Sequence, residues 1–362
     1  MHILAIIAPN GLGHYRRAVH VLDRLAARLP DARIDLVCEG WQLERGSFAA
    51  ATRVRARGRA ITGVMVPGVE WAGHGRGYGD GRLLSWLDRL AKVPEVAAAD
   101  LVLSDNLGGV LALRPDAILM GSHLWSDVLA EVAAADDGAR AFVRHERALL
   151  ERLRPPMLCV ADVVMPGVRE RTRAVELGWM CDLAAAGALA DEAPRHGRVA
   201  VLGGATGAAD DVLAGVLAAL RADGRWDVVG AREFGHELAD FAGCAAVVCR
   251  PGVGTLTECV TVGTPMLWAY EGGNVELAWN ARACAALGLG RDLGADLDPT
   301  QAPAALAALL AEPEVSATRG RLLARGRDGL DAAAAWLATR ATQGASANAA
   351  VVPANQMERT SS

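Results

Sequence analysis

One histidine and one aspartate each follow an apolar run that is typical of a buried strand. His14 comes after the run 2–8 and a glycine-containing turn, and it opens the helical pattern that follows. A helix N-terminus disfavours added positive charge, so we expect a neutral imidazole that could act as a general base. Asp105 ends the run 99–105, and an aspartate bonded to one imidazole nitrogen would orient the ring. The alternatives are a polar helix cap at position 14 and an Asx turn at position 105.

A second set of residues has the chemistry of a nucleotide site. The strand-like run 244–250 ends in Arg250, and glycines separate it from a helical segment that contains Glu258. An arginine can neutralise phosphate charge, and an acid one turn into the helix can accept ribose hydroxyls. The main-chain N–H groups of the turn would also face the phosphates, and they belong to Gly252, Gly254 and Thr255. The alternative is an Arg–Glu pair with a structural role.

Two further strand ends lead into loops with binding potential. After the run 197–204, a turn without a Walker lysine could offer main-chain N–H groups to a phosphate; its residues are Gly203, Gly204 and Thr206. An ordinary strand-to-helix turn is the alternative. After the run 265–270 comes a cluster that could hydrogen-bond a polyol, namely Glu271, Asn274, Glu276 and Asn280. The alternative there is a capped helix start, with Asn274 as the N-cap.

The elements that must position these residues alternate between short strand-like runs and longer helical patterns. Strands are expected at 2–8, 33–40, 99–105, 116–122, 197–204, 226–231, 244–250 and 265–270, and helices at 15–29 and 210–223. Such alternation predicts an α/β protein with doubly wound parallel sheets, and its restart predicts two Rossmann-like domains facing across a cleft. We place them at 1–175 and 176–338, with a join within 155–196 and a disordered tail at 339–362.

Composition narrows the classes of function. The 362 residues are 52% hydrophobic and 22% charged, with a net charge of -5, which argues against a nucleic-acid partner. The chain shows no signal-peptide pattern and no transmembrane run. Seven scattered cysteines form no CxxC pair and no Cys/His metal spacing, so we expect reduced cysteines, no bound metal and a cytoplasmic location. Peripheral membrane contact stays open.

These motifs resemble the GT-B glycosyltransferases that use nucleotide sugars. The closest likeness is to the bacterial lipid II N-acetylglucosaminyltransferase (MurG) group and the related UDP-glycosyltransferases, over about 1–40 and 197–290. GLGH resembles the family's N-terminal loop, whose histidine is the base and corresponds to His14, and Asp105 matches that histidine's partner. FGHEL resembles the element whose backbone reads the uracil, at Gly235, and RPGVGTLTE resembles R-x-G-x-x-T-x-x-E, with Glu258 on the ribose.

The resemblance implies an inverting, metal-independent hexosyltransferase that moves a sugar from a UDP-sugar, or another NDP-sugar, to an acceptor hydroxyl. It implies no cofactor beyond this co-substrate. The family's acid–Gln pair is Glu276-Leu277 here, which leaves the sugar open. Acceptors in natural-product or cell-envelope glycosylation remain open, as do a nucleotide-sugar hydrolase or epimerase on the same fold and an inactive nucleotide-sugar-binding protein.

One glycine-rich segment is a candidate acceptor loop. The segment 68–82 is mobile by composition, and three of its side chains could stack on or hydrogen-bond to an acceptor: Trp71, His74 and Tyr78. A surface excursion without a binding role is the alternative.

Overall fold

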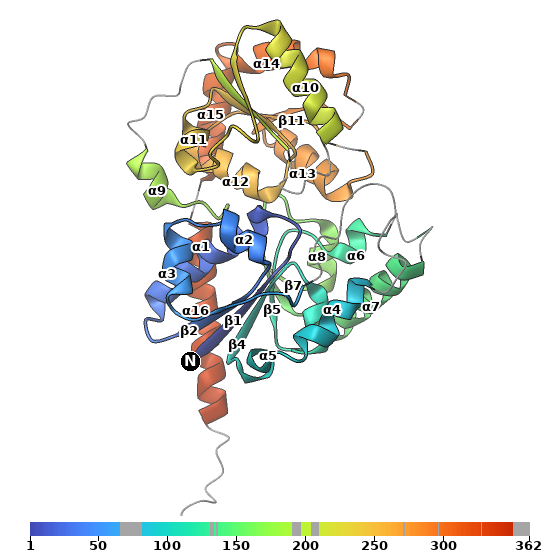
Figure 1. Cartoon of the computed structure of the whole chain (residues 1–362), viewed down its shortest axis with the longest axis vertical. Coiled ribbons are helices and arrows are strands. Elements are labelled where there is room, and N and C mark those ends of the chain that lie inside the picture. The colour runs from blue at the N-terminus through green and yellow to red at the C-terminus, as the bar shows by residue number, and fades with distance from the viewer. Residues whose placement is uncertain are drawn as a thin grey trace, which may run out of the picture.

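The computed structural model describes residues 1–65, 82–130, 134, 137–189, 197–203, 210–270, 272–295, 297–326 and 328–349. It contains two parallel sheets, each covered by helices, and the two halves of the molecule lie end to end (Figure 1). The N-terminal sheet has the order β3-β2-β1-β4-β5-β6-β7. Its strands are β1 (His2–Ile7), β2 (Arg33–Val37), β3 (Ala60–Ile61), β4 (Leu101–Asp105), β5 (Ile118–Met120), β6 (Pro156–Val160) and β7 (Arg173–Leu177).

The second sheet has the order β12-β11-β10-β8-β9, again with parallel pairs. Its strands are β8 (Arg198–Leu202), β9 (Asp227–Gly230), β10 (Ala246–Cys249), β11 (Met266–Trp268) and β12 (Gly290–Asp292). Strand order reverses between β1 and β4 in the first sheet and between β8 and β10 in the second. Ligands of doubly wound sheets bind at such reversals, outside the carboxyl ends of the strands.

The helices divide between the two halves in the same way. Those of the first half are α1 (Leu12–Arg28), α2 (Gly40–Arg45), α3 (Ala49–Arg55), α4 (Arg82–Leu90), α5 (Pro94–Ala98), α6 (Trp125–Val128), α7 (Asp137–Leu153) and α8 (Pro166–Arg171), with a 3₁₀ turn at Gly108–Ala112. After α9 (Leu183–Ala188), the second half has α10 (Asp210–Asp223), α11 (Leu238–Ala242), α12 (Val253–Val262), α13 (Val275–Ala286), a 3₁₀ turn at Pro299–Gln301, α14 (Ala302–Leu310) and α15 (Glu314–Arg325).

The apolar run of β1 is buried on both faces of its sheet. Ile3 and Ile7 join the same hydrophobic cluster as Leu22 of α1, while Leu4 and Ile6 join a second cluster across the sheet. Alternate side chains of a strand point to opposite faces, and helices cover both, which is why this strand is a continuous apolar run instead of an alternating pattern.

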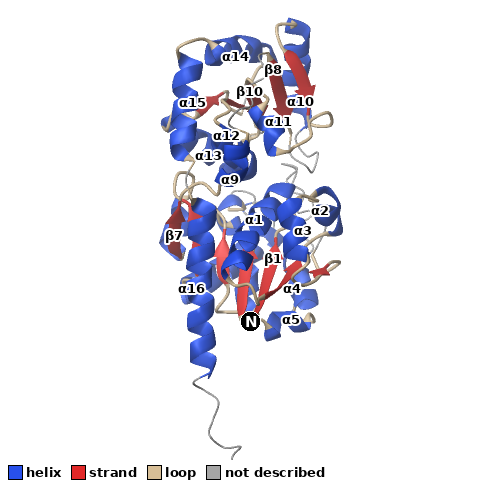
Figure 2. Ribbon diagram, turned by 90° about the vertical axis from the view of Figure 1, so that its left-hand side faces the viewer, coloured by secondary structure: helices blue, strands red, loops and turns tan. Residues whose placement is uncertain are grey.

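The last helix returns to the N-terminal half. α16 (Gly329–Ala349) runs beside α1 (Figures 1 and 2), and Leu330 and Leu337 share the cluster of Leu22. Residues 339–349 are thus helical where the sequence predicts a disordered tail, because the start of this helix buries an apolar face; residues 350–362 lie outside the described residues.

Every predicted strand corresponds to an observed one, within a few residues at each end. The strands expected from the sequence do not include β3, β6, β7 and β12. The stretch 155–196, where the sequence places the join, contains β6, α8, β7 and α9. The predicted boundary at 175–176 falls inside β7. Within the described ranges, no helix is both long and apolar enough to cross a membrane.

Candidate functional site

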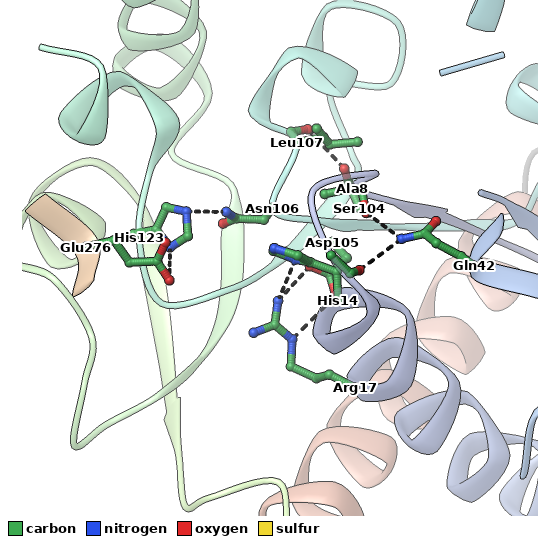
Figure 3. Close-up of polar contacts among 11 residues, drawn as sticks. Ala8, His14, Arg17, Gln42, Ser104, Asp105, Asn106, Leu107, His123 and Glu276 are labelled. Atoms are coloured by element: carbon green, nitrogen blue, oxygen red, sulfur yellow. Dashed lines mark hydrogen bonds and ion pairs between the residues drawn. The ribbon is translucent and has the colours of Figure 1, made fainter. Parts of the chain in front are cut away.

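His14 and Asp105 meet at the strand-order reversal of the first sheet. Ile7, the last residue of β1, pairs in register with Asp105, the last residue of β4. His14, in the first turn of α1, brings Nδ1 to 2.8 Å from Asp105 Oδ1 (Figure 3). The aspartate is 1% exposed and the histidine 18% exposed. A hydrogen bond from Nδ1–H to the carboxylate leaves Nε2 as the nitrogen that can accept a proton.

Arg17 also binds this aspartate. Its Nη2 donates to Oδ1 of Asp105 at 2.6 Å, and its Nε donates to Oδ2 at 3.3 Å. Burial raises the pKa of Asp105, whereas the charges of Arg17 and His14 lower it, and the net result is a pKa below the ordinary value. The carboxylate is therefore ionised at neutral pH. Sequence analysis missed Arg17, although its position one turn after His14 on the same helix was a usable signal.

A buried glutamine shapes the loop that carries His14. Gln42 of α2 is fully buried, and its Nε2 donates to the main-chain oxygens of Ala8 at 2.9 Å and Gly11 at 3.1 Å. Its Oε1 accepts from the N–H of Glu39 at 3.0 Å. Both the nitrogen and the oxygen of this amide are hydrogen-bonded. Gln42 therefore fixes the main chain of the loop between β1 and α1. The sequence carried no periodic or motif signal for this residue.

The N-termini of α1 and α12 face each other across the two halves. A Cβ built on Gly254 would lie 3.0 Å from the Cα of Gly13, so only glycine permits this backbone approach without displacement. Gly11 and Gly252 are the N-caps, and neither provides a side-chain cap. First-turn N–H groups without caps, together with two converging helix dipoles, favour an anion at this place.

Glu258 of α12 forms an ion pair with the opposite half. Its Oε1 lies 3.0 Å from Nε of Arg16 in α1, and Nη1 of the same arginine donates to the main-chain oxygen of His236 at 2.7 Å. Burial raises the pKa of Glu258 to about 7, even though Arg16 acts in the opposite direction. Arg250 directly follows β10, at the turn before α12. Arg16 had no counterpart among the sequence predictions.

Glu276, in the first turn of α13, faces a second histidine. Its Oε1 lies 3.4 Å from Nδ1 of His123, which follows β5 in the first half, and the amide of Asn106 lies 2.6 Å from Nε2 of the same ring (Figure 3). Burial lowers the pKa of His123 below its ordinary value, while Glu276 acts to raise it. Sequence analysis overlooked His123 and Asn106, although both follow predicted strands at the binding edge.

Two other residues of the predicted polyol-binding cluster form hydrogen bonds with main-chain atoms. Asn274 is the N-cap of α13, and its side chain accepts from the N–H of Leu277 at 3.1 Å. Asn280 is 1% exposed, and its Nδ2 donates to the main-chain oxygen of Pro251 at 3.0 Å. The bond of Asn280 fastens α13 to the turn after β10, whereas that of Asn274 lies within the N-terminus of α13 itself.

The remaining predicted residues lie at strand and helix ends or outside the described ranges. Gly203 follows β8, Gly235 is exposed in the loop before α11, and Thr255 lies in the first turn of α12. The predicted residues outside the described ranges are Gly204, Thr206, Glu271, Trp71, His74 and Tyr78.

No protein-family model and no curated protein sequence matches this chain, whereas several solved structures do. A protein described as the glycotransferase of kitacinnamycin is 18% identical, with a TM-score of 0.65 over 94% of this chain and 98% of that protein. UGT2 of Phytolacca americana, solved with UDP-2-fluoro-glucose and pterostilbene, is 10% identical, with a TM-score of 0.65 over 94% and 100%. The calicheamicin glycosyltransferase CalG4 is 17% identical, with a TM-score of 0.60 over 97% and 99%. The chain therefore has the GT-B fold, with two Rossmann-like domains.

Proposed function

We propose that this protein is an inverting glycosyltransferase that moves a sugar from a UDP-sugar to an acceptor hydroxyl. The observation that carries the proposal is the contact of His14 with Asp105 at the strand-order reversal, opposite the N-terminus of α12. The fold supports it, because the similar structures are of glycosyltransferases and one of them was solved with a UDP-sugar analogue.

In the proposed reaction, Nε2 of His14 takes the proton of the acceptor hydroxyl. The acceptor oxygen then bonds to the anomeric carbon as the bond from that carbon to the diphosphate oxygen breaks, and UDP leaves with inversion. Asp105 orients the ring and stabilises the imidazolium that forms. The turn before α12, the N-terminus of α1 and Arg250 stabilise the leaving diphosphate, without a metal ion in this proposal.

The same proposal assigns the ribose hydroxyls to Glu258 and the uracil to the main chain around Gly235. An ionised carboxylate can accept hydrogen bonds from both hydroxyl groups of the ribose. Because Arg16 contacts this carboxylate, the ribose must displace the arginine or share the carboxylate with it.

The test compares two His–Asp pairs of the same sheet. His2 lies at the opposite end of β1, and its Nε2 is 3.0 Å from Asp35, so His2→Ala is a matched control for His14→Ala. We expect His14→Ala to lower transfer by about a hundredfold or more, while the UDP affinity measured by calorimetry changes little. His2→Ala should retain transfer. Near-normal transfer by His14→Ala would remove His14 from the base role.

The same assay separates a hydrolase and an inactive binding protein from a transferase. Each UDP-sugar is incubated with and without a panel of acceptors drawn from natural products, glycans and lipids. Full-rate release of UDP and free sugar without acceptor would identify a hydrolase, and tight UDP binding without turnover would identify an inactive binding protein. A β-linked product from an α-linked donor, observed by NMR, would support inversion.

A further inference from the structure

His123 is a buried histidine whose ring is directed at the opposite half of the molecule. Its side chain is 4% exposed and stands edge-on to Trp125, with ring centroids 5.0 Å apart. Nδ1 faces Glu276 of the second half at 3.4 Å. This histidine therefore reaches, from the N-terminal half, a residue that the sequence analysis places in a polyol-binding cluster.

The surroundings of Asn106 fix which ring nitrogen of His123 carries the proton. The amide orientation that satisfies every neighbour is the reverse of the one drawn in Figure 3. In it, Nδ2 donates to the main-chain oxygen of His123 at 2.8 Å, and Oδ1 accepts from Trp125 Nε1 at 3.3 Å and from His123 Nε2 at 2.6 Å. The proton is then on Nε2, and Nδ1 of the neutral ring is an acceptor.

Two acceptors thus face each other across the halves. Nδ1 of neutral His123 and the carboxylate of Glu276 cannot hydrogen-bond to one another, and the 3.4 Å between them is long for a strong charged bond. Each needs a donor. Sugar hydroxyls are donors. Glu276 is followed by Leu277, whose side chain cannot bond to a hydroxyl, so the two positions of the acid–Gln pair supply one acceptor here.

The position also links the two proposed substrates. Asn106 directly follows Asp105 in the chain and has a left-handed φ of 57°, which turns its side chain toward His123 while Asp105 binds His14. The end of β4 therefore orients both histidines, one at the proposed base and one opposite Glu276.

We propose that His123 is a donor-sugar specificity residue: its Nδ1 accepts one hydroxyl of the transferred sugar while Glu276, from the opposite half, accepts a neighbouring one. This inference rests on the proposed function, and it selects sugars with two free adjacent hydroxyl groups.

The test uses two amides that replace different nitrogens of the ring. Asparagine can place its amide oxygen near the position of Nδ1, whereas glutamine reaches the position of Nε2. Calorimetry gives the dissociation constants of UDP and of UDP-glucose, UDP-galactose and UDP-N-acetylglucosamine. The readout is the gain in affinity of the best UDP-sugar over UDP. In His123→Gln, we expect the ratio of UDP-sugar affinity to UDP affinity to fall about tenfold. In His123→Asn most of this ratio should remain, and the affinity for UDP itself should be unchanged in both variants.

Glu276→Ala serves as a second variant in case His123→Gln does not fold, and it should lose a similar part of the gain. If either His123→Gln or Glu276→Ala keeps the full gain, the inference is overturned. It is also overturned if the wild type binds UDP but gains nothing from any sugar, a result that leaves the proposed nucleotide site intact. A wild type that does not bind UDP would overturn the proposed function and this inference with it.

Discussion

Arg16 of α1 closes onto Glu258 of α12, with 3.0 Å between Nε and Oε1. The arginine comes two residues after His14 and the glutamate one turn after the close contact between the two helix N-termini. The helix that carries the proposed base therefore also supplies the side chain that contacts the proposed ribose ligand. Since Nη1 of Arg16 also bonds to the main-chain oxygen of His236, this arginine contacts two of the segments assigned to the nucleoside.

We expect Arg16→Met to bind uridine about twofold to fivefold more tightly than the wild type. A partly exposed ion pair contributes up to about 1 kcal/mol, and the variant no longer has to give it up when the ribose engages Glu258. Uridine isolates this effect from any phosphate contact. Calorimetry at about pH 9, above the raised pKa of Glu258, measures it with the carboxylate ionised.

Arg24→Met is the matched control for that experiment, because Arg24 lies two turns further along α1 and pairs with Asp182 at 3.0 Å. Its loss should leave uridine affinity unchanged. Weaker uridine binding by Arg16→Met would mean that the arginine assists the nucleoside instead of competing with it.

Gly254→Ala should push the two halves apart. The added Cβ would lie 3.0 Å from the Cα of Gly13, and overpacking of this kind costs about 1–3 kcal/mol. We expect kcat/KM for transfer to fall about fivefold or more. Gly320→Ala is the control, because nothing lies within 4 Å of a Cβ there and Gly320 lies inside helix α15, outside the proposed nucleotide site. Equal activity of the two variants would show that this contact is dispensable.

Asp105→Asn should lower kcat by about a hundredfold and leave UDP affinity nearly unchanged. The amide keeps the size of the side chain but removes the charge that stabilises an imidazolium at His14. Stopped-flow or steady-state rates, with calorimetry for UDP, separate the two effects. Asp35→Asn is a close control, because Asp35 is also buried and bonded to a histidine and an arginine, His2 and Arg33. If Asp35→Asn lost as much kcat, the effect would be one of folding.

Glu146 makes folding stability depend on pH. It is 1% exposed, its carboxylate accepts from the N–H of Ser126 at 2.5 Å, and burial raises its pKa to about 7 from 4.5. A carboxyl whose pKa is raised in the folded state contributes stability that is fully present below 4.5 and is lost as pH rises through about 7. Relative to Glu146→Gln, the wild type should therefore lose up to about 3 kcal/mol of unfolding free energy across this window.

Urea unfolding at a series of pH values measures that difference. Glu151→Gln, at an exposed position of the same helix α7, should run parallel to the wild type at every pH. A difference between the wild type and Glu146→Gln that does not change with pH would contradict the assignment.

The predicted proximity of His14 and Asp105 follows from two rules about β-strands. A continuous apolar run predicts a strand buried on both faces, and parallel strands place their carboxyl ends at one edge. Those two rules were enough to bring together residues that lie far apart in the chain. They fail for Pro156, which begins β6, because a proline signals a break without saying whether a strand follows.

These rules could not predict the contacts between the two halves of the molecule. Arg16–Glu258 and His123–Glu276 join side chains from different sheets, and no periodicity relates one sheet to the other. For Asn274, the sequence was compatible with both a sugar ligand and an N-cap. Its bond to Leu277 is that of an N-cap.

By itself, the sequence determined the alternating elements of two doubly wound sheets and the strand ends that carry polar residues, His14 and Asp105 among them, because apolar periodicity and turn chemistry act over short distances along the chain. Only the tertiary structure decided the return of α16 to the first half and the partners of Glu258 and Glu276. These depend on how two packed bodies meet, and close packing at their contact, as between Gly13 and Gly254, sets which side chains face each other.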